Sequence, residues 1–109
     1  MIMLIGLAVT PMYILINKVM RIIFCHLIGD YVLQTDYLAK TKGQNWYHLI
    51  AHCFLYIVPF YFVLGCDWRI CVLLITHFVV DALKARYKKI GYVTDQIIHY
   101  AVALVYLLE

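Results

Sequence analysis

A long run without charge constrains this chain more than any other feature of its sequence. Residues 46–65, WYHLIAHCFLYIVPFYFVLG, contain no Lys, Arg, Asp or Glu. As a helix, a run of about 20 residues spans the roughly 30 Å of hydrocarbon in a bilayer. Only 14% of the 109 residues are charged, whereas a soluble domain usually has about 25%. The sequence therefore predicts an integral membrane protein, with Asn45 and Gly65 bounding this helix.

Three further segments predict helices that cross the membrane. They cover residues 19–34, 68–86 and 95–108. Asp67 is the expected N-cap of the third of the four helices, and Thr94 that of the last. The predicted fold class is all-α, an integral membrane helical bundle of four core transmembrane helices in a single domain over residues 20–109.

Two segments lie outside these four helices. Residues 35–45 are polar and amphipathic, which favours a place at the membrane interface. Residues 1–19 form an apolar extension interrupted by Pro11. It fits a short extra helix, a continuation of the first span or a secretory signal, although no basic residue precedes the apolar run. If Met20 is the natural start, this extension is accessory.

Basic residues predict the orientation of the bundle. The connections at 40–45 and 84–92 carry six Lys and Arg, whereas the loop around Asp67 carries only Arg69. Positively charged loops stay in the cytoplasm. The few short basic stretches lack the pattern of aromatic and basic residues that marks a nucleic-acid-binding module, so nucleic acid is excluded as a partner.

Every histidine belongs to a pair of polar residues four positions apart. The pairs are His26 with Asp30, His48 with His52, His77 with Asp81, and Asp95 with His99. Residues at this spacing lie on the same face of a helix. A strongly polar side chain left unpaired in hydrocarbon costs at least a few kcal/mol. We therefore expect the four pairs to face one another inside the bundle.

The four pairs also have matching depths. On the last three helices, the two members lie three and seven positions from the cytoplasmic ends at Asn45, Lys84 and Tyr92. At the rise of an α-helix, this places them about 5 to 10 Å inside the membrane boundary. The first pair joins this layer if its helix ends near Gln34.

Imidazole nitrogens and carboxylate oxygens form the ligand set of Zn, Mn or Fe. Ligands from four helices resemble the arrangement in which bundles hold two metals. The sequence therefore predicts one or two divalent ions bound by all eight paired residues. Such a centre can activate water and hydrolyse a phosphoester. Asp30, Asp81 or Asp95 would then be the bridging carboxylate or general base, acting on a lipid-linked or phosphate-bearing substrate.

Three alternatives remain open. The pairs can form a transit site for a divalent cation or a proton, which at this length would require a homo-oligomer. They can also be local hydrogen bonds that set helix register, as in a phage accessory or holin-like protein. Lys84 and Arg86 either attract an anionic head group or only mark a cytoplasmic loop.

The segment HLIGDYVLQTDYLAK (26–40), followed by HLIAH, THFVVDALK and DQIIHY, resembles a family of small bacterial and prophage-encoded integral membrane proteins of unknown function. The resemblance covers about residues 20–108, and HxxGDxxLQTD is its most specific motif. It implies the bacterial inner membrane, or the host membrane for a phage protein, and it implies no reaction. The placement of His and Asp on membrane helices is also similar to that of membrane-bound metal-dependent hydrolases, in ligand style only.

Overall fold

The computed structural model describes residues 2–108, with side chains from residue 11 onward, and these residues form helices without any strand. The elements are α1 (Ile2–Leu27), the π-helical turn η1 (Ile28–Val32), α2 (Asp36–Thr41), α3 (Trp46–Leu64), α4 (Trp68–Ala85), α5 (Tyr92–Ala103) and the 3-10 turn η2 (Leu104–Leu107). The all-α prediction is confirmed.

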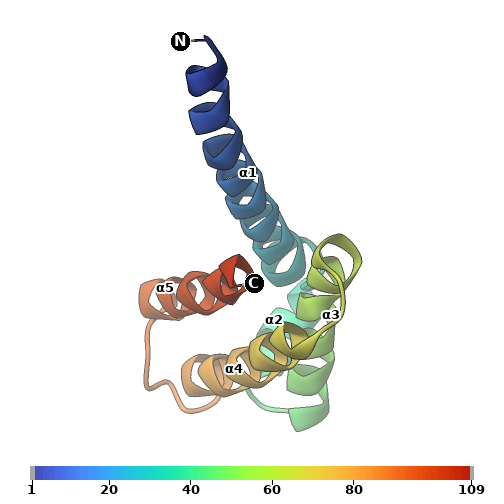
Figure 1. Cartoon of the computed structure of the whole chain (residues 1–109). Helices are drawn as coiled ribbons and strands as arrows, with labels where there is room; N and C mark the ends of the chain where they lie inside the picture. Colours follow the sequence, from blue (N-terminus) through green and yellow to red (C-terminus); the bar gives the residue numbers. More distant parts are fainter. Residues whose placement is uncertain (1, 109) are drawn as a thin grey trace.

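Four helices close into a ring around one interior (Figure 1). Helix α3 packs between α1 and α4, while α5 packs between α4 and α1. The first part of α1 extends well beyond this body (Figure 1), which gives the molecule dimensions of 60 × 25 × 24 Å. Because α1 continues through Pro11, the apolar extension and the first predicted span form one helix rather than two.

Three capping predictions are confirmed. The Asn45 side chain accepts hydrogen bonds from the backbone N–H groups of the first turn of α3, at 2.9 and 3.3 Å. Gly65 ends α3 with a φ of 88°, a left-handed conformation that favours glycine. Asp67 accepts a hydrogen bond from the backbone N–H of Arg69 at 2.9 Å and so begins α4.

The predicted start of the last helix is wrong. Helix α5 begins at Tyr92, with Gly91 as an N-cap that makes no side-chain hydrogen bond. The carbonyl of Gly91 accepts the first helical hydrogen bond, from the N–H of Asp95 at 3.0 Å. Thr94 therefore lies inside the first turn, where its hydroxyl is not needed as a cap.

The π-helical turn η1 brings the end of α1 against α3. A Cβ atom on Gly29 would lie 2.4 Å from the carbonyl oxygen of Tyr56, so only glycine permits this approach. The turn ends at Val32, two residues before the predicted end of the helix. As a result Asp30, which is 5% exposed, is held in the interior against α3.

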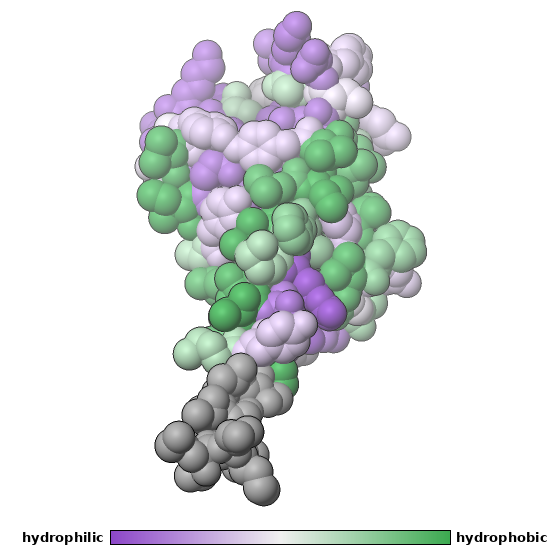
Figure 2. All heavy atoms as spheres, turned by 90° about the horizontal axis from the view of Figure 1, so that it is seen from above, coloured by the Kyte–Doolittle hydropathy of each residue, from purple (hydrophilic) through white to green (hydrophobic). Residues whose placement is uncertain are grey.

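Two segments of the described residues are long and apolar enough to cross a membrane, Pro11–Val32 and Trp46–Leu64. Large apolar side chains are exposed on every long helix, including Phe24, Phe62 and Ile75. On the face seen in Figure 2, apolar residues lie between more hydrophilic residues at two ends of the body.

Candidate metal centre

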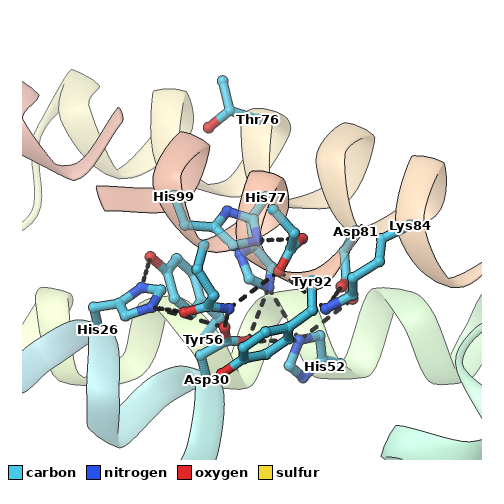
Figure 3. A network of polar contacts seen from close by, with 12 residues as sticks. His26, Asp30, His52, Tyr56, Thr76, His77, Asp81, Lys84, Tyr92 and His99 are labelled. Atoms are coloured by element: carbon cyan, nitrogen blue, oxygen red, sulfur yellow. Dashed lines mark hydrogen bonds and ion pairs between the residues drawn. The ribbon is translucent and has the colours of Figure 1, made fainter. Parts of the chain in front are cut away.

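The interior of the ring contains one polar cluster (Figure 3). Seven of the eight paired residues are buried there: His26, Asp30, His52, His77, Asp81, Asp95 and His99. They come from α1, η1, α3, α4 and α5. The spacing of the pairs was therefore sufficient to identify most of the cluster.

His48 lies outside the cluster. Its Nδ1 atom is 2.7 Å from the hydroxyl of Thr41, and its ring packs against Tyr37 with the ring centroids 5.1 Å apart. Both partners belong to α2, which packs on α3. Helix α2 thus contacts the first turn of α3 through His48, and these contacts hold the His48 side chain outside the cluster that contains His52.

Three ligand atoms converge at the first candidate ion position, formed by Asp30, His52 and His77. The two Nε2 atoms face each other at 3.0 Å. Asp30 Oδ1 lies 3.4 Å from His52 Nε2 and 3.8 Å from His77 Nε2. Nitrogens bound to one tetrahedral zinc ion at 2.0–2.1 Å would be about 3.3 Å apart. These atoms therefore have the spacing needed to bind one ion together.

The two facing imidazoles also have an unsatisfied hydrogen-bonding pattern. Between them, His52 Nε2 and His77 Nε2 can share only one proton. Both Nδ1 atoms are buried without a hydrogen-bond partner. A cation between the Nε2 atoms would bind both lone pairs in place of that single shared proton.

A second candidate ion position is formed by Asp30, Asp95 and His99. His99 Nε2 is 3.0 Å from Asp95 Oδ1. In each group of three residues, the ligand atoms all lie within 4.8 Å of one another. Asp30 belongs to both groups, so it is the carboxylate placed to bridge two ions.

Two lysines neutralise the other two carboxylates. Lys42 Nζ lies 3.0 and 2.9 Å from the oxygens of Asp81. Lys84 Nζ lies 3.0 Å from Asp95 Oδ2 and 3.4 Å from Asp81 Oδ1. Among the described residues, no ammonium or guanidinium group contacts Asp30, which faces imidazoles and the Gln96 amide. The cluster thus has one more carboxylate than ammonium groups, at the position where the imidazoles converge.

Gln96 holds Asp30 in place. Its Nε2 donates hydrogen bonds to Asp30 Oδ2 at 2.9 Å and to Asp95 Oδ2 at 3.1 Å. With the amide in this orientation, its Oε1 accepts from His26 Nε2 at 2.9 Å, so His26 Nδ1 accepts from the hydroxyl of Tyr56 at 2.9 Å. Both nitrogens of His26 are thereby engaged, which makes His26 a positioning residue rather than a ligand.

Sequence reasoning missed Lys42, Gln96 and Tyr56. Lys42 resembles any basic loop residue, yet it is only 4% exposed. It reaches Asp81 because the adjacent Gly43 packs so closely on α4 that a Cβ would lie 2.3 Å from a backbone carbonyl oxygen. Such a contact leaves no periodic signal in a sequence.

The cluster is closed on one side and hollowed on the other. The Tyr56 ring stacks on His77 with centroids 3.8 Å apart. Next to it lies a buried apolar core that includes Phe60, Leu73 and Tyr106. On the opposite side, at the end of the bundle with the basic loops, Lys42 and Lys84 line a hollow of about 460 Å³.

Comparison with protein families gives a match over residues 19–108 to DUF3307, whose description is "protein of unknown function". The chain belongs to the DUF3307 family. Every residue of the polar cluster, from His26 to His99, lies in the matched segment, so the candidate centre is contained in the DUF3307 region. The family description names no activity, and bacterial or prophage origin stays a prediction. Comparisons with curated proteins and with solved structures gave no match.

Proposed function

We propose that this chain is an integral membrane, metal-dependent hydrolase that acts on a lipid-linked or phosphate-bearing substrate. The observation that carries the proposal is the convergence of His52 Nε2, His77 Nε2 and Asp30 Oδ1 within 3.0 to 3.8 Å in a buried interior. These three residues would hold one ion, and Asp30, Asp95 and His99 would hold a second.

Membrane insertion is supported by the distribution of apolar side chains. Phe62 is 78% exposed and Ile75 is 63% exposed, although water disfavours large apolar surfaces on monomeric proteins. A surrounding bilayer accounts for this exposure. The end with the basic loops faces the cytoplasm.

Zn, Mn or Fe bound in the cluster would polarise a phosphoryl oxygen and lower the pKa of a water molecule. Asp30 would contribute to holding both ions, while the amide of Gln96 fixes its orientation. A carboxylate oxygen of Asp95 that does not hold an ion would accept the proton of the attacking water. The water oxygen bonds to phosphorus, the phosphorus–oxygen bond to the rest of the substrate breaks, and the departing oxygen takes up a proton.

The closed side of the cluster favours a hydrolase over a transporter. A transit site needs a path to both faces of the membrane. Here Tyr56 and Phe60, which are 1% and 0% exposed, belong to an apolar core on the far side of the cluster. A substrate that enters from the basic end would meet this apolar core and would have no path to the other face of the membrane.

Elemental analysis of detergent-purified protein tests the metal centre. We expect about one or two equivalents of Zn, Mn or Fe in the wild type and a clear loss in His77→Ala and Asp30→Asn. His48→Ala is the matched control, since it removes a histidine outside the cluster, and it should keep its metal. A wild type with far less than one equivalent would refute the metal centre.

Phosphate release from a panel of phosphate-bearing lipids tests the reaction. The metal-loaded wild type and His48→Ala should release phosphate, and Asp30→Asn should not. If a metal-loaded wild type releases none, but takes up metal in proteoliposomes in a manner abolished by Asp81→Asn, the transporter replaces the hydrolase.

A further inference from the structure

Four lysines surround a hollow at the basic end of the bundle, here called the lysine hollow. They are Lys40, Lys42, Lys84 and Lys88, and the hollow has a volume of about 460 Å³. Lys42 and Lys84 contact the carboxylates of the polar cluster. Lys40 and Lys88 are exposed, and neither contacts a carboxylate among the residues that the structure describes. The hollow is therefore positively charged at its rim and adjoins the cluster at its base.

Lys88 has an unusual backbone conformation. Its φ is 53°, and it is the one residue other than glycine with a positive φ among the described residues. A lysine rarely adopts this conformation, which costs about 1 kcal/mol or more and is often associated with functional positions. The turn is fixed by a hydrogen bond of 2.8 Å from the N–H of Lys89 to the carbonyl of Leu83. It places Lys88 in the wall of the lysine hollow and leaves Lys89 outside.

A second hollow, here called the tyrosine groove, adjoins the first. It measures about 500 Å³ and is mainly apolar, and its lining residues are Tyr31, Tyr92, Val93, Gln96, Ile97 and Tyr100. Tyr92 lines both hollows and forms a hydrogen bond with Tyr31. Gln96 connects the groove to the cluster, because its amide contacts Asp30 and Asp95.

We infer that these two hollows bind one amphiphile, with its phosphate head group in the lysine hollow and its apolar chain in the tyrosine groove. The charges match, since a phosphate monoester carries about −1.5 to −2 at pH 7 and the ammonium groups of Lys40 and Lys88 have no carboxylate partner within the described part of the chain. The position of Tyr92 in the walls of both hollows fits a molecule with a polar and an apolar part. This inference rests on the proposed function and narrows its substrate to a lipid phosphate.

A general attraction of basic loops to anionic lipids is the simpler explanation of these lysines. If this attraction were the cause, Lys88 and Lys89 would contribute equally to lipid binding. The lysine hollow predicts a larger contribution from Lys88, because of the two only Lys88 lines it. This difference makes the two explanations separable by substitution.

The experiment measures binding of short-chain phosphatidic acid to the detergent-purified full chain. Short-chain diacylglycerol, which has the same chains without phosphate, and inorganic phosphate are the two comparison ligands. We expect phosphatidic acid to bind at least tenfold more tightly than either. Equal binding of phosphatidic acid and diacylglycerol, or of phosphatidic acid and inorganic phosphate, would overturn the inference.

Lys88→Gln and Lys89→Gln form a matched pair that removes the same charge from adjacent positions. Lys88→Gln should weaken binding of phosphatidic acid by about fivefold, as expected for one lysine at an anionic group, and Lys89→Gln should leave it within about twofold. Equal losses would favour the general attraction and overturn the lysine hollow.

Metal content measured on the same samples separates this inference from the proposed function. Bound metal without selective phosphatidic acid binding would overturn the lipid-phosphate assignment and leave the metal centre standing. Selective binding that depends on Lys88 in metal-free protein would support the two hollows while refuting the hydrolase.

Discussion

Gly29 in η1 lies directly against the backbone of Tyr56 in α3. A Cβ at position 29 would be 2.4 Å from the Tyr56 carbonyl oxygen and 3.0 Å from its Cα. Neither atom can move without shifting α3. The position of Asp30, the next residue, depends on this contact.

Gly29→Ala should therefore lower the stability of the fold by about 1 to 3 kcal/mol, as overpacking in a closed interior does. It should also reduce metal content by displacing Asp30. Gly91→Ala is the control, because a Cβ there meets nothing within 4 Å. Thermal unfolding in detergent measures the stability of the two variants. Equal melting temperatures would show that α3 can shift to accommodate the added methyl group.

Lys42→Met should destabilise the chain strongly, by about 3 to 5 kcal/mol, since it leaves the buried Asp81 carboxylate with less of its charge compensated. Lys40→Met removes an exposed lysine of the same loop and should change stability by at most about 0.5 kcal/mol. Denaturant unfolding provides the comparison. If the double variant Lys42→Met/Asp81→Asn is no more stable than Lys42→Met, the Lys42–Asp81 ion pair is not the cause.

Metal removal should lower the melting temperature. A bound ion at a hundredfold excess over its Kd stabilises the folded state by about 2.7 kcal/mol, and a chelator removes that contribution. The shift should shrink in His52→Ala, which loses one of the two proposed ion positions, and persist in full in His48→Ala. Melting curves with and without chelator test this, and an equal shift in both variants would place the ion elsewhere.

Asp67 predicts a pH effect at the opposite end of the bundle. Hydrogen bonds from the Arg69 guanidinium and backbone N–H hold the pKa of Asp67 below its usual range. A carboxylate with a depressed pKa stabilises the fold above its unfolded pKa of about 3.9, and this contribution is lost as the pH falls through the folded pKa. Asp67→Asn should therefore be less stable than the wild type at neutral pH, with the difference shrinking below about pH 4. A constant difference across this range would mean that the carboxylate charge is not involved.

Local chemistry explains which parts of the fold the sequence could predict. Asn45, Gly65 and Asp67 act on their own helix ends, so residue type alone identifies them. The prediction that Thr94 caps the last helix was wrong because the helix has already begun at Tyr92, after the N-cap residue Gly91. The π-helical turn was not predicted, since it results from the contact of Gly29 with a helix distant in sequence.

Some residues of the candidate centre could likewise be predicted from the sequence, and others could not. Spacing by four residues identified side chains that share a helix face, and seven of them lie together in the buried interior. His48 has the same spacing, but its side chain contacts Tyr37 and Thr41 of α2 instead of the cluster. Lys42 and Gln96 take part through contacts between elements, and these depend on how loops pack rather than on periodicity.

Asp30 belongs to both groups of candidate ligands, so the two ion positions share one carboxylate. A substitution that retunes one ion position by moving this carboxylate also alters the other, so the two cannot diverge separately in size or metal preference. In the proposed centre, variation in metal use among related chains should then come from His52, His77, Asp95 or His99, each of which belongs to a single group.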